Sequence, residues 1–210
     1  MNLKIEKVKE SRIKEVDFSK LSFGRTFADH MFICEYKDGK WQNPTIKPYG
    51  ALSLEPSASV FHYGQAVFEG MKAYKDDNGH VFLFRPQENY KRINKSCERL
   101  AMPAFPEEWF DKALRTLVDI DSEWIKPGFG NALYLRPFVI ATTPGVQASP
   151  AKDYLFIIIT APVQSYYSGD VRVKIADYYS RAANGGFGFA KAAGNYAGQF
   201  YPTQQAAAEG

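Results

Sequence analysis

The chain has 210 residues, of which 45% are hydrophobic and 23% charged, a composition typical of a soluble globular protein and not of a disordered or fibrous one. Its formal net charge of +3 is too small to indicate a nucleic-acid surface, and no basic run interleaves with aromatic residues. Aromatic residues make up 15% of the chain, which indicates an aromatic core or an aromatic-lined pocket.

The cysteines, the histidines and the N-terminal sequence indicate the cellular compartment and whether a metal site is expected. Cys34 and Cys97 lack the spacing of a metal or redox motif, so we expect buried thiols in a reducing compartment rather than a disulfide. The three histidines are scattered, and no metal site is expected. The first twenty residues mix lysine with glutamate, which is not the pattern of a signal or transit peptide. The longest apolar run, residues 154–159, is too short to span a membrane, and we expect a cytoplasmic protein.

The first part of the chain predicts mainly β structure. Residues 1–21 are expected to form a charged, loosely held leader. Residues 31–36 have the pattern of a strand, and the Lys-Asp-Gly-Lys run at 37–40 favours a hairpin turn. Three prolines between residues 44 and 56 indicate an irregular connection. An Asp-Asp-Asn-Gly turn predicts a second hairpin over residues 73–84.

The middle of the chain predicts two amphipathic helices. Pro86 suits the first position of a helix, and the apolar residues after it repeat at intervals of three and four. This stripe consists of Tyr90, Ile93, Cys97 and Leu100. Pro106 opens a second helix, which we expect to end at the Pro-Gly pair 127–128. Its inward residues are Trp109, Phe110, Leu114, Leu117 and Val118.

Two strands are predicted after the helices. Residues 132–141 alternate, so that Tyr134, Arg136 and Phe138 share one face. Leu133, Leu135 and Val139 share the other. Residues 154–160 are too apolar for a sheet with one solvent-exposed face and indicate a strand that is buried on both faces.

Composition places a domain boundary near residue 166. The stretch from Pro162 to Asp170 has the composition of a linker. The expected organisation is a small N-terminal domain at 1–165, an interdomain linker at 166–170 and the beginning of a larger second domain at 171–210.

This second unit is expected to begin with a strand at 171–175, where Val and Ile alternate with Arg and Lys. Residues 195–209 are weakly helical. With about forty residues, the unit is too short to bury a core by itself. We expect it either to pack on the first unit or, the favoured alternative, to continue past Gly210.

Lys191 is the most informative single residue. It stands among small and aromatic residues, with five glycines within seven positions of it. Apolar surroundings remove water from a lysine, which lowers its pKa and leaves the amine free to attack a carbonyl. The glycines allow the backbone to approach a flat or phosphorylated ligand. The alternative is a surface lysine in a flexible loop.

Four stretches carry a family resemblance. They are His62–Lys72, Arg92 with its neighbours, the Tyr-Leu-Arg-Pro run at 134–137, and the Lys-x-x-Gly-Asn-Tyr run at 191–196. In this order and spacing they resemble the fold-type IV pyridoxal-phosphate enzymes, and among them the branched-chain amino-acid aminotransferases. The resemblance implies an α+β fold, with a small N-terminal α/β domain followed by the start of a larger domain. It runs from about Leu21 to the last residue.

The resemblance also implies the roles of three residues at the cofactor. Lys191 matches the lysine that holds pyridoxal 5'-phosphate covalently and moves the proton at the substrate Cα. Arg92 matches the arginine that binds the cofactor phosphate, a task that suits a planar forked donor. Tyr196 matches the tyrosine that contacts the cofactor ring hydroxyl.

A second set of positions is implied to bind substrate. Its aromatic members would select Leu, Ile and Val by buried area and exclude charge by desolvation. They are Phe23, Phe68 and Tyr166, with Tyr63 supplied across a homodimer. Arg136, with Tyr134 beside it, matches the arginine that binds the second carboxylate of 2-oxoglutarate. Gly145 and Val146 match a loop that reaches towards the partner's site.

Three parts of the family pattern are not found in these 210 residues: the carboxylate at the pyridine nitrogen, the second phosphate-binding segment and the substrate-carboxylate turn. Without them the cofactor is half held and its electron sink impaired, so we expect no turnover from this stretch as a separate molecule. The alternatives are a D-amino-acid aminotransferase or an aminodeoxychorismate lyase of the same fold type, an inactive truncated fragment, or an α+β domain whose aromatics are only core.

Overall fold

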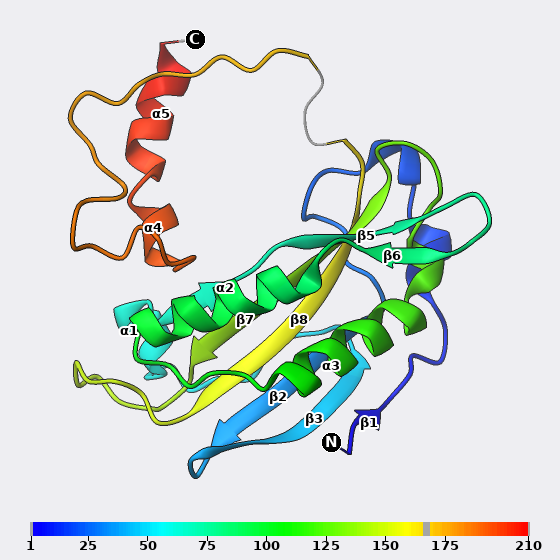
Figure 1. The fold of residues 1–210 in the computed structure, drawn as a ribbon, viewed down its shortest axis with the longest axis horizontal. Coiled ribbons are helices and arrows are strands. Elements are labelled where there is room, and N and C mark those ends of the chain that lie inside the picture. Colours follow the sequence, from blue (N-terminus) through cyan, green and yellow to red (C-terminus); the bar gives the residue numbers. More distant parts are fainter. Residues whose placement is uncertain (1, 166–168, 210) are drawn as a thin grey trace.

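A computed structural model describes residues 2–165 and 169–209 (Figure 1). Its strands are β1 (Lys4–Ile5), β2 (His30–Lys37), β3 (Lys40–Pro48), β4 (Ala66–Phe68), β5 (Met71–Lys75), β6 (Val81–Leu83), β7 (Ala132–Ala141) and β8 (Tyr154–Val163). Its helices are α1 (Ser59–Tyr63), α2 (Pro86–Arg99), α3 (Glu107–Ile120), α4 (Gly194–Ala197) and α5 (Phe200–Ala208), with 3₁₀ turns at Arg12–Glu15, Phe18–Lys20 and Ser122–Trp124.

The strands form one sheet, and α2 and α3 lie side by side on one of its faces (Figure 1). The strand order is β1-β3-β2-β8-β7-β5-β6, with β4 also paired to β7. All of these pairs are antiparallel except β1 with β3. This mixed helix-and-sheet architecture confirms the predicted α+β class.

Both predicted hairpins form, but the expected irregular connection is wrong in its first part. Pro44 and Pro48 belong to β3, which pairs with β2. The register of this pair shifts between Ile33 and Glu35, and Asn43 adopts a left-handed backbone with φ of 54°. A proline has no N–H to give to a ladder, but it is tolerated at such an irregularity. Pro44 therefore falls where the pairing of β3 is interrupted, and Pro48 is the last residue of the strand, paired with His30.

The two predicted helices also form, and the second is shorter than expected. In α2, Ile93 and Cys97 of the predicted stripe are completely buried. The α3 helix ends at Ile120, well before the Pro-Gly pair. Asp121 caps it, and a 3₁₀ turn then buries Trp124. The chain leaves the helix at this point because Asp121 is held by hydrogen bonds from His30 on β2.

The core lies between the sheet and the two helices and is rich in aromatic rings. Phe156 on the central strand β8 stacks on Phe105 with 3.8 Å between ring centroids and meets Phe32 and Phe110 edge to face. Cys34 and Cys97 are free and buried, as predicted, and burial raises the pKa of each thiol to about 12. Part of the aromatic content of the sequence therefore belongs to the core, while other rings, such as those of Phe84 and Phe129, are exposed.

Truncating the central ring of this core gives the first testable prediction. We expect Phe156→Ala to lower the free energy of unfolding by about 3–5 kcal/mol, because it removes buried contacts and leaves a cavity. Phe84→Ala is the matched control: Phe84 is exposed, and its loss is expected to change stability by less than about 0.5 kcal/mol. Denaturant unfolding of both variants measures the difference. Equal effects would contradict the assignment of Phe156 to the core.

The N-terminal leader is not loosely held, contrary to the prediction. Strand β1 pairs with β3, and the Val8 amide donates a hydrogen bond of 2.9 Å to Nε2 of His30. The buried Asp29 carboxylate accepts hydrogen bonds from the Ser11 hydroxyl at 2.5 Å and the Arg12 amide at 3.0 Å. Periodicity could not reveal these contacts, because they join residues about twenty to forty positions apart.

Acid is expected to release this leader. Burial by itself raises the pKa of Asp29, but hydrogen bonds from Ser11, Arg12 and Trp124 together hold it below its ordinary value. A carboxyl with a depressed folded pKa stabilises the fold above its unfolded pKa of about 3.9 and loses that contribution as pH falls through the folded pKa. We expect Asp29→Asn to cost about 1–3 kcal/mol at pH 6, with the gap to wild type closing below about pH 4. A gap that is constant with pH would contradict this account. Burial raises the pKa of the neighbouring Asp121. Asp121 is present in both wild type and Asp29→Asn, so its titration cancels when the two stabilities are compared.

After β8 the chain leaves the sheet (Figure 1). It returns to the sheet just before α4, where Ala192 forms a bridge with Val67 of β4. The predicted weak helix is present as two pieces, α4 and α5. The predicted strand at 171–175 is wrong: these residues are irregular, and Val173 is 87% exposed. A strand needs neighbours for its backbone groups, and none of the described strands pairs with this segment. The expected linker falls partly on residues 166–168, outside the described residues, and the domain division stays a prediction.

Candidate functional site

Lys191 is fixed through its backbone between the sheet and α2. Its amide donates to Oγ of the buried Ser96 on α2 at 2.9 Å, and its carbonyl accepts from the Phe68 amide of β4 at 3.0 Å. The Ala193 amide donates to the Ala66 carbonyl at 3.0 Å, so that this stretch runs along β4 as a short strand would. The lysine therefore has a defined position even though it lies in a glycine-rich loop.

The side chain of Lys191 meets a phenol and an aromatic ring. Its Nζ donates a hydrogen bond of 2.7 Å to the Tyr196 hydroxyl and lies 4.5 Å from the Phe68 ring centroid. Tyr196 reaches it because α4 turns the chain back, and the buried Asn195 side chain fixes this turn by donating to the Phe187 and Ala190 carbonyls. An amine in contact with a phenol is an arrangement that can hold and transfer a proton.

Phe68 joins this pair to a second polar group. The Arg136 guanidinium lies 4.5 Å from the centroid of the same Phe68 ring, and donates to the Tyr134 hydroxyl from Nε at 3.0 Å and Nη2 at 2.8 Å. Tyr134 in turn meets the Phe23 ring edge to face at 5.0 Å. The predicted alternation of β7 is confirmed, since Leu133, Leu135 and Val139 are buried against the helices. Tyr134 and Arg136 therefore share the opposite face.

Gly70 sits against this polar group and leads to a prediction. A Cβ at residue 70 would overlap the Tyr134 hydroxyl, at a separation too short for any real contact. We expect Gly70→Ala to displace the Tyr134 side chain and, with it, the Arg136 guanidinium that Tyr134 holds. The family resemblance assigns Arg136 to a substrate carboxylate, so we expect binding of a dicarboxylate such as glutarate, followed by calorimetry, to weaken about tenfold or more, as for the loss of one hydrogen bond to a charged group. Gly50→Ala, where a Cβ has open space, is the control and should bind as wild type does.

Arg92 approaches the site from α2 and is paired with a buried acid. Its Nε and Nη2 donate to the two carboxylate oxygens of Glu69 at 2.5 Å and 2.8 Å. Hydrogen bonding to Glu69 raises the pKa of Arg92 above its ordinary value, with further contributions from the charges of Glu69 and Tyr196. Ser96, which holds the Lys191 amide, also donates to the Arg92 carbonyl at 2.9 Å, one turn back along α2. Arg92 therefore lies one helical turn from the residue that holds Lys191, and its guanidinium could bind an anionic group.

The other predicted site residues lie elsewhere. The Tyr63 hydroxyl donates to the Val146 carbonyl, and both side chains are exposed. No described contact links this pair to Lys191, although Gly145 beside it is tied to Ser57. Tyr166 lies outside the described residues. The structure thus gathers Lys191, Tyr196, Phe68, Arg136, Tyr134, Phe23 and Arg92, and places Tyr63 with Val146 at a separate exposed position.

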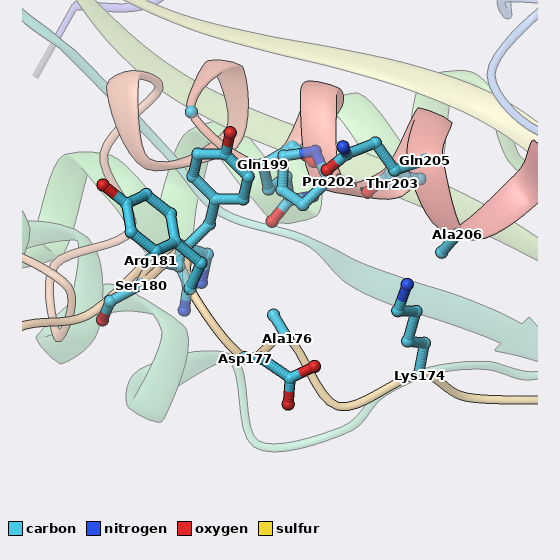
Figure 2. A pocket seen from close by; sticks show the side chains of 13 residues that line it. Lys174, Ala176, Asp177, Ser180, Arg181, Gln199, Pro202, Thr203, Gln205 and Ala206 are labelled. Atoms are coloured by element: carbon cyan, nitrogen blue, oxygen red, sulfur yellow. Dashed lines mark hydrogen bonds between the residues drawn. The ribbon is translucent and has the colours of Figure 1, made fainter.

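One cavity of the described residues lies away from the lysine. It has a volume of about 610 Å³ and lies between α5 and residues 174–181 (Figure 2). None of the predicted site residues lines it. Arg181 lines this cavity, and its guanidinium lies 5.8 Å from the Tyr196 ring centroid. The candidate site is therefore identified by its lysine, phenol and guanidinium groups and not by this cavity.

Sequence reasoning missed three residues of the site. Glu69 was part of the His62–Lys72 stretch but received no role, although a lone acid between apolar residues and a glycine was a usable signal. Ser96 gave no signal, because a serine on a helix is ordinary. Asn195 stood inside the quoted lysine motif, but its task of fixing the turn depends on the folded backbone. Among the described residues, no group of three or more His, Cys, Asp and Glu is arranged to hold a metal ion.

Comparison with known proteins connects this geometry to a family. A family model described as Amino-transferase class IV matches residues 66–210, more than half of the chain. The branched-chain-amino-acid transaminase 1 of Bacillus subtilis (strain 168) is 50% identical over 212 residues. That match covers 98% of this chain and 60% of the relative, so the chain spans less than two thirds of the relative's length.

Two solved structures share the fold. The branched-chain aminotransferase from the thermophilic archaeon Thermoproteus uzoniensis, with norvaline, matches with a TM-score of 0.58 at 19% identity, over 86% of this chain and 57% of that chain. An aminotransferase from Brucella abortus bound to the cofactor PLP matches with a TM-score of 0.56 at 18% identity, over 85% and 59%. They confirm the fold-type IV arrangement expected from the sequence. No helix among the described residues is long and apolar enough to cross a membrane. By its sequence and its fold, the chain belongs to the class IV amino-transferases.

Proposed function

We propose that this chain forms part of a pyridoxal-phosphate-dependent aminotransferase that acts on the branched-chain L-amino acids Leu, Ile and Val, with 2-oxoglutarate as acceptor. The observation that carries the proposal is the Lys191 amine, which donates to the Tyr196 hydroxyl at 2.7 Å, with Arg92 one turn of α2 from Ser96, the residue that holds the Lys191 amide. The names of the curated relatives support the substrate class.

The residues present fit this cofactor group by group. An amine suits its aldehyde, a phenol suits its ring hydroxyl, and a guanidinium with free N–H groups suits its phosphate. Lys191, Tyr196 and Arg92 would supply these three groups. Pyridoxal phosphate, when bound, supplies the electron sink that makes a proton at the substrate Cα removable.

The protein groups then divide the remaining work. Lys191 removes the Cα proton and returns it, which requires the free amine. The Tyr196 hydroxyl accepts a hydrogen bond from that amine and so holds it in place between proton transfers. Phe68 excludes water on one side of the amine, with its ring centroid 4.5 Å away. Arg92 provides the positive charge at the phosphate end.

Substrate selection is assigned to the group around Phe68. The apolar rings of Phe68 and Phe23, with Tyr166 as a proposed addition, favour branched aliphatic side chains through buried area. Arg136, on the same strand face as Tyr134, binds the second carboxylate of 2-oxoglutarate by a charge-assisted hydrogen bond. The same group of residues would thereby serve both an apolar and an acidic substrate, since Lys191 Nζ and the Arg136 guanidinium each lie 4.5 Å from the Phe68 ring centroid.

The proposal extends to the assembly and its location. A homodimer would use the exposed contact between Tyr63 and Val146, with Tyr63 serving the neighbouring site. The proposed organisation is a small domain at 1–165, a linker at 166–170 and the beginning of a larger domain at 171–210. We propose a cytoplasmic protein whose partners are small amino-acid and 2-oxo-acid substrates.

Substrate turnover tests the proposal. The intact protein with pyridoxal phosphate and 2-oxoglutarate is expected to convert L-leucine, L-isoleucine and L-valine to 2-oxo acids, and D-alanine at least about a hundredfold more slowly, a difference of about 2.7 kcal/mol in transition-state binding. Glutamate formation measures the rate. Faster turnover of D-alanine would contradict the substrate class while leaving the family intact.

A further inference from the structure

Glu69 is a buried charge for which the proposed reaction has no direct use. Its side chain is 0% exposed, and its carboxylate accepts four hydrogen bonds. The donors are Arg92 Nε at 2.5 Å, Arg92 Nη2 at 2.8 Å, Asn89 Nδ2 at 2.8 Å and the Gly70 amide at 3.1 Å. A carboxylate removed from water is stable only when it is paired and hydrogen-bonded in this way. The Glu69 carboxylate, directly after β4, is thus a buried acceptor whose hydrogen-bonding needs are met.

The partner of this acid is only half withdrawn from solvent. A guanidinium has five N–H groups in a rigid plane, and Glu69 takes two of them on one edge. The other three N–H groups of Arg92 remain, and its side chain is 53% exposed. Because the plane is rigid, fixing one edge also fixes the direction in which the opposite edge presents its donors. A long arginine side chain would otherwise sample many rotamers.

We propose that Glu69 is a positioning residue, which holds Arg92 so that the free edge of the guanidinium receives the phosphate of the cofactor. This inference rests on the proposed function. It gives Glu69 no contact with cofactor or substrate: the acid acts through the arginine, with Asn89 and the Gly70 amide fixing the acid itself. The buried end anchors the pair, and the exposed end meets the ligand.

Orientation must be separated from charge, because Glu69 also cancels the charge of Arg92. If charge alone decided, removal of the acid would strengthen phosphate binding through a gain in Coulomb attraction. If orientation decides, removal weakens binding, since glutamine offers one acceptor oxygen where the carboxylate offers two. Aspartate keeps the charge and withdraws both oxygens by one methylene. The pair Glu69→Gln and Glu69→Asp therefore distinguishes the two effects.

The experiment compares pyridoxal 5'-phosphate with pyridoxal, which lacks only the phosphate, on the intact protein. The absorbance change on titration gives an affinity for each, and their ratio isolates the phosphate contribution. We expect this ratio to fall about tenfold in both Glu69→Gln and Glu69→Asp, as for one hydrogen bond to a charged group. Glu88→Gln is the matched control. Glu88 lies on the exposed surface of α2, paired with Lys91, so its removal changes the charge equally and should leave the ratio unchanged.

The possible outcomes are distinct. Retained binding of pyridoxal shows that a variant is folded, and a general loss of structure would lower both affinities together. Asn89→Ala provides a milder variant, with a smaller fall in the same direction. An unchanged or increased ratio in Glu69→Gln would overturn the positioning role. If wild-type protein bound neither compound to Lys191, the proposed function itself would fail.

Discussion

Replacing Lys191 with alanine is expected to abolish transamination without unfolding the protein. The amine is the group that removes and returns the Cα proton in the proposed reaction, and loss of a positioned general base alone costs roughly 10²- to 10⁴-fold in rate. Loss of the covalent link to the cofactor adds to this. The fold should survive, because the contacts that hold residue 191, from Ser96 and Phe68, are made by its backbone.

A neighbouring lysine supplies the control. The Lys95 ammonium on α2 lies 5.4 Å from the Phe189 ring centroid, close to the same loop, but it has no proposed part in the chemistry. We expect Lys95→Ala to keep the turnover number within about threefold of wild type, in line with the small effect of an exposed cation–π contact. Comparable losses in the two variants would mean that the loop needs positive charge in general and that Lys191 has no special role.

Replacing Arg136 with leucine is expected to damage the acceptor half of the reaction selectively. The KM for 2-oxoglutarate should rise by about 10- to 100-fold, as for the loss of a hydrogen bond between charged groups. The KM for L-leucine should change little, because that substrate has no second carboxylate. Steady-state kinetics with each substrate varied in turn measures the two values.

The neighbouring tyrosine refines this second prediction. The Arg136 guanidinium donates twice to the Tyr134 hydroxyl, so Tyr134→Phe removes an oriented acceptor while the charge stays. We expect a smaller rise of KM, about threefold to tenfold, again only for 2-oxoglutarate. Equal changes of KM for leucine and 2-oxoglutarate in the Arg136 variant would show that the arginine supports the fold of β7 and does not bind the acceptor substrate.

Much of the sheet and of the two helices that cover it could be predicted because their signals are local. The alternation over residues 132–141 gave both the strand and the face shared by Tyr134 and Arg136. The apolar residues that repeat at intervals of three and four in α2 correctly predicted which face of this helix is buried. These patterns depend on neighbours within a few positions, where backbone geometry determines which side chains lie together.

What escaped prediction depends on contacts between distant residues. The leader was expected to be loose because nothing near it indicates that Asp29 accepts from Ser11 and Arg12. The end of α3 at Ile120 depends on the hydrogen bond between Asp121 and His30 on β2. The hydrogen bond from Arg92 to Glu69 joins helix α2 to the end of strand β4. In the opposite direction, the alternating pattern at 171–175 predicted a strand that finds no partner among the described strands.

The central claim is that Lys191 carries the cofactor, and borohydride reduction tests it most directly. The reagent converts a carbon–nitrogen linkage between a lysine and the cofactor aldehyde into a stable amine, which peptide mass analysis can locate. After incubation of the intact protein with pyridoxal phosphate, the account predicts a pyridoxyl adduct on the peptide that contains Lys191 and none on the corresponding peptide of Lys191→Ala. An unmodified Lys191 peptide, or an equal adduct on another lysine in both proteins, would contradict it.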